Sequence, residues 1–241
     1  MKNILWFLII PLLFFCCERE QNMLVLNGKF TQDYTGKIYL SKVTPNGLIL
    51  LDSSIVKNSS FQFKVKSDHP KNEESVLQPA FYQLWISPVN GFVTIGRGKE
   101  TLEMEIDPQS MVKSYTISGG EDAELMWQLD QMLKSFISTI DPIYEIYETH
   151  IENDSIREEI EATYQELLQQ YEIDLKNFIL ENKSSLVAIP AFYQVYNRRR
   201  FIDEESNLEL LQMIYDELRV QFPNHEDVLF LEERIERINR L

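Results

Sequence analysis

The chain has 241 residues, 44% of them hydrophobic, and its 38 acidic side chains against 23 lysines and arginines give a formal charge of −15. This excess of acid argues against binding to nucleic acid, because affinity for phosphates depends on lysine and arginine displacing counterions. The length and the apolar content are enough for one large domain or two modest domains, each with a hydrophobic core.

The N-terminus has the layout of a secretory signal. A weakly basic start leads into the apolar residues 4–15, and Cys16 and Cys17 follow directly. An apolar helix of this length rises only about 18 Å, whereas crossing a bilayer takes roughly 20 residues. We therefore expect residues 1–17 to be a bacterial lipoprotein signal peptide with its lipobox, and residues 18–22 to be a tether. The alternatives are an ordinary cleaved secretory peptide and an uncleaved anchor.

We expect Cys17 to carry the lipid, with Cys16 as the alternative. Processing favours a small residue before the modified cysteine; Cys17 follows a cysteine, whereas Cys16 follows the bulky Phe15. The usual lipobox has Gly, Ala or Ser there, so the sequence departs from that pattern. Two or three acyl chains, at roughly 0.8 kcal/mol per buried methylene, would hold the protein on a membrane. The predicted location is the cell envelope, at the periplasmic or outer face of the outer membrane.

Residues 23–119 show the alternation of apolar and polar side chains that is typical of strands with one buried face. The clearest runs are Phe61, Phe63 and Val65, and later Leu102, Met104 and Ile106. Turn-forming residues separate about eight such runs and leave no room for crossover helices, which parallel pairs would need. We therefore expect an antiparallel β-sandwich or open barrel in this part of the chain.

The apolar period becomes helical after Gly120. One stripe runs from Leu125 to Tyr144 and a second from Ile156 to Phe178, at steps of three and four residues. Ser155 and Glu158 form a capping-box pattern that predicts a turn between the stripes. We expect a helical hairpin, kinked at Pro142, and then a helical bundle in residues 120–241. The fold class is α+β, with strands and helices in separate parts of the chain.

Three shorter helices are expected after the hairpin. The first spans residues 184–196, the second follows a capping box of Ser206 and Glu209, and the third follows Pro223. The arginines at residues 198–200 would then lie near the end of the first of these helices, where cations complement the macrodipole. Their alternative role is contact with an acidic partner.

Residues 50–63, Leu-Leu-Asp-Ser-Ser-Ile-Val-Lys-Asn-Ser-Ser-Phe-Gln-Phe, resemble a known family, as do Gly28, Phe30 and residues 36–40. They are similar to an uncharacterised N-terminal module of Bacteroidetes-type envelope lipoproteins. In that family the β-module is followed by a helical region, with a segment like residues 182–188. A thioredoxin-like domain of thiol-disulfide oxidoreductase or peroxidase type comes next. The resemblance covers most of the chain after the tether.

The chain departs from that family at the catalytic residues. Redox members carry a Cys-x-x-Cys pair, in which one thiolate attacks a disulfide and the second resolves the intermediate. No cysteine follows Cys17, and the sequence ends at Leu241, where the thioredoxin-like domain would begin. We therefore expect no oxidoreductase activity, no cofactor and no disulfide in the mature chain.

Histidines and a glycine-rich segment are the next candidates for a site. His69, His150 and His225 lie far apart without metal-ligand spacing, and we expect all three at the surface. Residues 96–99, Gly-Arg-Gly-Lys, precede a strand rather than a helix. We therefore interpret them as a hairpin turn, not as a phosphate-binding loop.

Acidic residues and a short modification pattern complete the candidates. The carboxylates of Asp141, Glu145, Glu148 and Glu152 fall near one helix face, and paired carboxylates can cleave glycosidic bonds. In so acidic a chain we interpret them as a solvated face. Residues Asp154, Ser155 and Ile156 fit a three-residue O-glycosylation pattern of such envelopes, so Ser155 is a candidate for glycosylation.

Two main classes of function remain. The favoured one is a non-catalytic, lipid-anchored interaction module that contacts an envelope protein or glycan. The second is an accessory subunit of an envelope redox system whose thioredoxin-like domain is a separate chain. A hydrolase using helix carboxylates is the third, and it requires a cleft with a buried carboxyl group of raised pKa. Candidate contact residues, most of them better interpreted as core, are Phe81, Tyr82, Trp85, Tyr193 and Tyr196.

Overall fold

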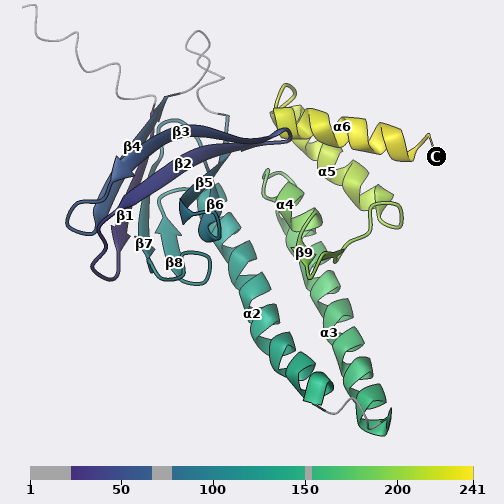
Figure 1. Ribbon diagram of the computed structural model, residues 1–241. Helices are drawn as coiled ribbons and strands as arrows, with labels where there is room; N and C mark the ends of the chain where they lie inside the picture. Colours follow the sequence, from purple (N-terminus) through teal and green to yellow (C-terminus); the bar gives the residue numbers. More distant parts are fainter. Residues whose placement is uncertain (1–22, 67–77, 150–153, 241) are drawn as a thin grey trace, which may run out of the picture.

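The computed structural model describes residues 23–66, 78–149 and 154–240, with the strands first and the helices after them (Figure 1). The first strands are β1 Met23–Phe30, β2 Lys37–Thr44, β3 Gly47–Ile55, β4 Ser60–Lys66, β5 Ala80–Ser87, β6 Asn90–Gly96, β7 Thr101–Ile106 and β8 Tyr115–Ser118. The helices are α2 Glu121–Thr149, α3 Asp154–Glu181, α4 Ala188–Phe192, α5 Leu208–Gln221 and α6 Glu226–Ile238. Two short strands, β9 Val195–Tyr196 and β10 Arg199–Arg200, follow α4. The predicted β-then-α layout is confirmed.

Two four-stranded sheets, in the orders β4-β1-β7-β8 and β3-β2-β5-β6, form a sandwich rather than a closed barrel. Alternation along each strand places one face of each sheet between them. Leu26 and Leu102 of the first sheet and Ile38 and Leu84 of the second are fully buried in this shared layer. The period of two seen in the sequence therefore marks the interior of the sandwich.

β1 and β7 pair in parallel, with Leu26 opposite Leu102 and Phe30 opposite Ile106. The prediction that the strands would pair only in antiparallel fashion was wrong at this position. A parallel pair needs a long crossover connection, which is usually a helix. Here the chain between β1 and β7 contributes β2, β3, β5 and β6 of the second sheet and returns once to the first sheet as β4, so strands take the place of the crossover helix.

Strands β5 and β6 of the second sheet are buried on both of their faces. Leu84 and Phe92 point into the sandwich, whereas Phe81 and Ile95 pack into the core formed by the helices. Strands covered on both faces carry apolar residues at most positions instead of alternating cleanly. The helices therefore form a third layer on this sheet, and the β and α parts of the chain share a core.

The change from strands to helices falls at Gly119. This residue has φ of +99°, and a Cβ there would lie 2.1 Å from the carbonyl oxygen of Thr101. Only glycine combines that backbone conformation with that close approach. β8 ends one residue before it and α2 begins two residues after it, which matches the change of period in the sequence.

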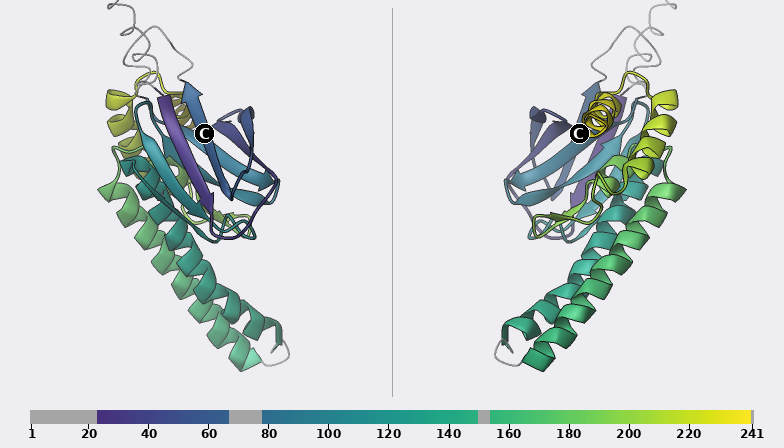
Figure 2. Two further views of the ribbon diagram at one scale, coloured as in Figure 1. Left: turned by 90° about the vertical axis from the view of Figure 1, so that its left-hand side faces the viewer. Right: turned by 90° about the vertical axis from the view of Figure 1, so that its right-hand side faces the viewer.

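α2 and α3 form the predicted antiparallel hairpin, which extends well beyond the sandwich (Figures 1 and 2). Near the sheet the two helices meet at Phe136 and Tyr171, whose ring centroids lie 4.5 Å apart. α2 continues through Pro142. Farther out Tyr144 and Ile146 are about half exposed, because only α3 faces α2 there.

Residues 184–196, predicted as one helix, are instead turns, the short α4 and strand β9. Asn197 and Arg198 have φ of +47° and +65°. Positive φ at both central residues is what a two-residue type I′ turn requires, and here it joins β9 to β10. Arg199 and Arg200 therefore lie in a strand, and their predicted position at a helix end was wrong.

The last two helices begin differently from one another. α5 starts at Leu208, and the residue before it makes no side-chain capping hydrogen bond. The predicted capping box was wrong, because the backbone N–H of Ser206 donates to Asp203 Oδ2 at 2.8 Å in a turn that precedes the helix. α6 follows Pro223 as expected and has His225 as its N-cap.

We predict that Ile95→Ala lowers the free energy of unfolding by about 3 kcal/mol, because it opens a cavity between the second sheet and the helices. Urea denaturation followed by circular dichroism and by tryptophan fluorescence measures the loss. Val89→Ala, at a side chain that is 89% exposed, is the control and should change stability by less than about 0.5 kcal/mol. An equally stable Ile95→Ala variant would contradict the shared core.

Candidate binding site

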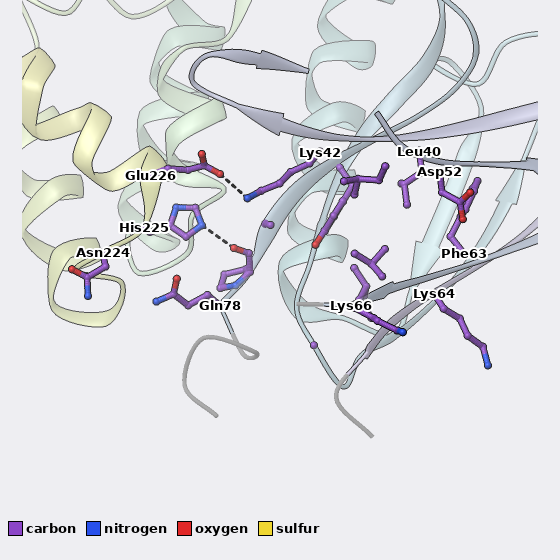
Figure 3. A pocket seen from close by; sticks show the side chains of 17 residues that line it. Leu40, Lys42, Asp52, Phe63, Lys64, Lys66, Gln78, Asn224, His225 and Glu226 are labelled. Carbon is purple, nitrogen blue, oxygen red and sulfur yellow. Dashed lines mark hydrogen bonds and ion pairs between the residues drawn. The ribbon is translucent and has the colours of Figure 1, made fainter. Parts of the chain in front are cut away.

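A cavity of about 480 Å³ opens on one side of the sandwich, where both sheets end. β4 is an edge strand of the first sheet, β3 is an edge strand of the second, and a short turn joins them. The start of α6 closes the opposite side of this cavity (Figure 3). We call it the edge cavity, and its volume is within the range of small-ligand sites.

Apolar side chains of the sandwich form the floor of the edge cavity. Leu24 and Leu40 come from β1 and β2, Phe63 from β4 and Tyr82 from β5, and all four are buried. They belong to the alternating pattern that fills the sandwich, so the same side chains that build the core also line the cavity. Apolar contact is therefore available to any ligand that enters it.

Charged side chains stand on the rim of the edge cavity. Lys42 reaches across from β2 to Glu226 at the start of α6, with Nζ and Oε1 2.9 Å apart (Figure 3). Lys64 and Lys66 of β4 and Asp52 of β3 also line the cavity. Among the described residues that line the cavity, three lysines stand against two carboxylates, in contrast to the charge of −15 on the whole chain.

His225 lies on the α6 side of the edge cavity and is only 6% exposed. Its Nδ1 accepts from the backbone N–H of Asp227 at 3.3 Å, so Nε2 carries the proton and donates to the carbonyl oxygen of Pro79 at 2.8 Å. The prediction of a surface histidine was wrong here. The signal in the sequence was its place just before a helix start, where a side-chain acceptor caps the first turn.

Burial lowers the pKa of His225, although the carbonyl of Pro79 acts in the opposite direction. The ring is therefore neutral near pH 7, and its 3.5 Å approach to the carboxylate of Asp227 is not an ion pair. Burial also raises the pKa of Asp227 to about 6. Both ring nitrogens of His225 are engaged with the backbone, so the residue positions α6 against the strand β5.

Arg97 follows β6 and connects the strands to the helices. Its guanidinium pairs with Asp122 of α2, whose other carboxylate oxygen accepts from Ser185 Oγ at 2.6 Å. Residues 96–99 are a turn, as predicted, but they join β6 of one sheet to β7 of the other and do not form a hairpin. Arg97 is committed to this internal contact, which supports a structural role for the segment.

Asp130 of α2 is a partly buried carboxyl group that accepts from Tyr115 Oη at 2.5 Å. Burial raises its pKa to about 6, although the hydrogen bond from Tyr115 acts in the opposite direction. This is the kind of group that the hydrolase hypothesis requires. Asp130 does not line the edge cavity, and its Oδ2 accepts the hydrogen bond of Tyr115, the first residue of β8.

Arg200 and Glu204 form a second internal cluster. Arg200 Nη1 lies 2.7 Å from Glu204 Oε2, and Arg234 Nε donates to Glu204 Oε1 at 3.1 Å. Burial alone would raise the pKa of Glu204, but its polar neighbours, with Arg234 the strongest, outweigh burial and lower the pKa. Arg200 of β10 and Arg234 of α6 therefore meet at the same carboxylate, while the Arg200 side chain stays about half exposed.

The proposed modification sites lie outside what the structure describes. Cys16 and Cys17 precede the first described residue, and the side chain of Ser155, in the first turn of α3, is not described. His69 and His150 also fall outside the described ranges. The lipidation and glycosylation predictions therefore stand as they were made from the sequence.

Two other groups of predicted residues are described. Asp141 and Glu145 are exposed on α2, as expected of a solvated face, and Asp141 accepts from Tyr196 Oη at 2.9 Å. Glu152 and the side chain of Glu148 are outside the described ranges. Among the aromatic candidates, Phe81 and Tyr82 are buried in the two cores, and the half-buried residues are Trp85, Tyr193 and Tyr196.

The described residues, 23–66, 78–149 and 154–240, bear on metal binding and on insertion into a membrane. Within these ranges no three side chains of His, Cys, Asp or Glu gather in a way that would hold a metal ion. None of the helices in the same ranges combines the length and the hydropathy needed to span a bilayer. No protein-family model and no curated protein matches the chain.

We predict that His225→Ala destabilises the protein by about 2 kcal/mol, because it removes the cap of α6 and leaves the carbonyl of Pro79 without its donor. His225→Asn retains a capping side chain and should cost less than half as much. Thermal and urea denaturation of both variants measure the difference. Equal losses in the two variants would show that the ring does not cap the helix.

We predict that Asp130 makes the protein less stable as the pH rises. Its pKa in the folded protein, about 6, lies above the unfolded value near 3.8, so folding favours the protonated form and stability falls between about pH 4 and pH 6. Asp130→Asn removes this pH-dependent loss of stability, which is about 3 kcal/mol by the size of the pKa shift. Urea midpoints from pH 4 to pH 7 test it, with Glu161→Gln, at an exposed residue, as the control.

Proposed function

We propose that this protein is a non-catalytic, lipid-anchored interaction module of the cell envelope, and that the edge cavity is its binding site. The observation that carries the proposal is the combination of a buried apolar floor, at Leu40 and Phe63, with a rim rich in lysine. A concave apolar surface with a few charged groups at its edge is the usual form of a ligand site.

The geometry favours binding over catalysis at this cavity. His225 is the group there with acid–base chemistry near pH 7, and both of its ring nitrogens are held by the backbone at Pro79 and Asp227. Lys42 is held by Glu226. Asp130, whose raised pKa would suit a general acid, is hydrogen-bonded to Tyr115 away from the cavity.

The sequence predicts a lipid anchor, and this anchor would hold the module close to a membrane. β1 begins at Met23, so a tether of residues 18–22 would keep the sandwich within about 20 Å of an acylated Cys17. Met23 pairs with Lys66 of β4, which lines the edge cavity. The proposed binding site would thus lie at the end of the sandwich from which the anchor leaves.

We predict that radiolabelled palmitate is incorporated into the wild type and into Cys16→Ala, but not into Cys17→Ser. Labelling in the producing cells, followed by gel electrophoresis, measures it. If Cys17→Ser keeps the palmitate label and Cys16→Ala loses it, Cys16 is the lipidated residue. Absence of label from the wild type would remove the anchor from the proposal.

Photo-crosslinking in intact cells tests the binding function. A photoreactive residue in place of Asp52, on the rim of the cavity, should yield discrete adducts with envelope components that the same residue in place of Val89 does not yield. Recovery of a thioredoxin-like protein would favour the accessory redox function. Identical adducts from both positions, or turnover of a defined small molecule by the purified chain, would contradict the proposal.

A further inference from the structure

β3 is an edge strand whose side chains are exposed along nearly its whole length. Among the described residues it pairs with β2 only, so its other edge has no strand beside it. Leu48, Ile49 and Leu50 are 58%, 54% and 59% exposed, and Ile55 is 63% exposed. The strand therefore presents apolar side chains on both faces together with a row of backbone donors and acceptors.

Such an edge is unusual, because proteins normally protect edge strands with lysine, proline or a short length. β4, the edge of the other sheet on the same side, carries Lys64 and Lys66. β8, at the far edge of that sheet, is only four residues long. β3 has nine residues, no lysine and no proline, and Asp52 is its only charged side chain.

The exposed edge leads directly into the edge cavity. Leu51 and Asp52, in the middle of β3, line the cavity together with Lys64 and Lys66 of β4. A chain laid along β3 would thus pass these lysines. Screening limits the influence of remote charge to about 8 Å at physiological salt, so these lysines, rather than the acidic remainder of the protein, set the local preference.

We propose that β3 binds an extended peptide segment of a partner protein by strand addition, and that this segment alternates acidic and apolar residues. Backbone hydrogen bonds to β3 would supply much of the affinity, and side-chain contacts the specificity. Apolar residues would cover Leu48 and Leu50, and carboxylates would face Lys64 and Lys66. This deepens the proposed interaction function and rests on it.

A second copy of the chain is the less favourable occupant. Its own β3 would bring apolar residues but only Asp52 to meet the lysines. Each copy also carries a formal charge of −15, and that like charge opposes association. Charge complementarity at the rim therefore favours a separate acidic segment.

The test uses the purified full-length chain and a fluorescein-labelled octapeptide of alternating glutamate and valine. Fluorescence anisotropy should show saturable binding, with at least tenfold weaker binding of a lysine–valine peptide and of a glutamate–valine peptide with a central proline. Hydrogen exchange of the β3 amides should slow when the peptide is bound, because they gain strand partners.

Matched variants locate the site. Leu50→Asp and Lys66→Glu should each weaken binding of the acidic peptide at least tenfold, whereas Val89→Asp, at an exposed turn, should leave it unchanged. Circular dichroism confirms that the variants fold. Unchanged binding by Leu50→Asp, or equal binding of the proline-containing peptide, would overturn strand addition at β3.

Two further outcomes would also overturn the inference. Sedimentation equilibrium that shows a dimer of the wild type and a monomer of Leu50→Asp would assign the edge to a second copy. Absence of peptide binding at millimolar concentration would reject the acidic segment. In that case palmitate labelling and crosslinking at Asp52 would still decide separately whether the protein is an anchored interaction module.

Discussion

The second sheet, β3-β2-β5-β6, is the structural constraint on which the rest of the protein depends, because its strands β5 and β6 are buried on both faces. Leu84 and Phe92 close the sandwich on one side, and Phe81 and Ile95 enter the helical core on the other. A substitution in these strands therefore alters the packing of both cores. The helices are a layer on the sheet, since their apolar faces would otherwise be left open to water.

A buried carboxylate helps to fix how the helical layer sits on the strands. Asp122 receives the guanidinium of Arg97 from the strand part and the hydroxyl of Ser185 from the turn before α4. Glu204 receives Arg200 and Arg234 and so joins β10 to α6 within the helical part. Because buried charges are costly unless paired, the contact at Asp122 favours one arrangement of the layers.

The proposed site exists because this layered arrangement is incomplete on one side. The helices cover β5 and β6, but the sheets end at β3 and β4, which leaves the edge cavity and an open strand edge next to one another. His225 closes the cavity on the α6 side through its contact with Pro79. A stable body of this kind can hold a binding edge rigidly, which lowers the entropy lost when a partner chain is ordered on it.

The sequence by itself determined the order of strands and helices. The spacing of apolar residues, every second residue in strands and every third or fourth in helices, depends only on residues that are close in the chain. It placed the change at Gly119, the sandwich core at residues such as Leu102 and the helical hairpin around Phe136. Local patterns failed where long-range contacts decided the outcome. The type I′ turn at Asn197 interrupted an apparently helical stretch, and packing against Pro79 buried His225.

Only the tertiary structure decided which strands are neighbours and which edges stay open. The parallel pairing of β1 with β7 depends on five intervening strands, four of them in the second sheet, and no pattern within β1 or β7 records it. The edge cavity likewise joins residues as distant as Leu24, Lys64 and His225. Hydrophobic periodicity indicates which face of a helix or strand is buried. Which element packs against that face depends on the packing of the complete chain.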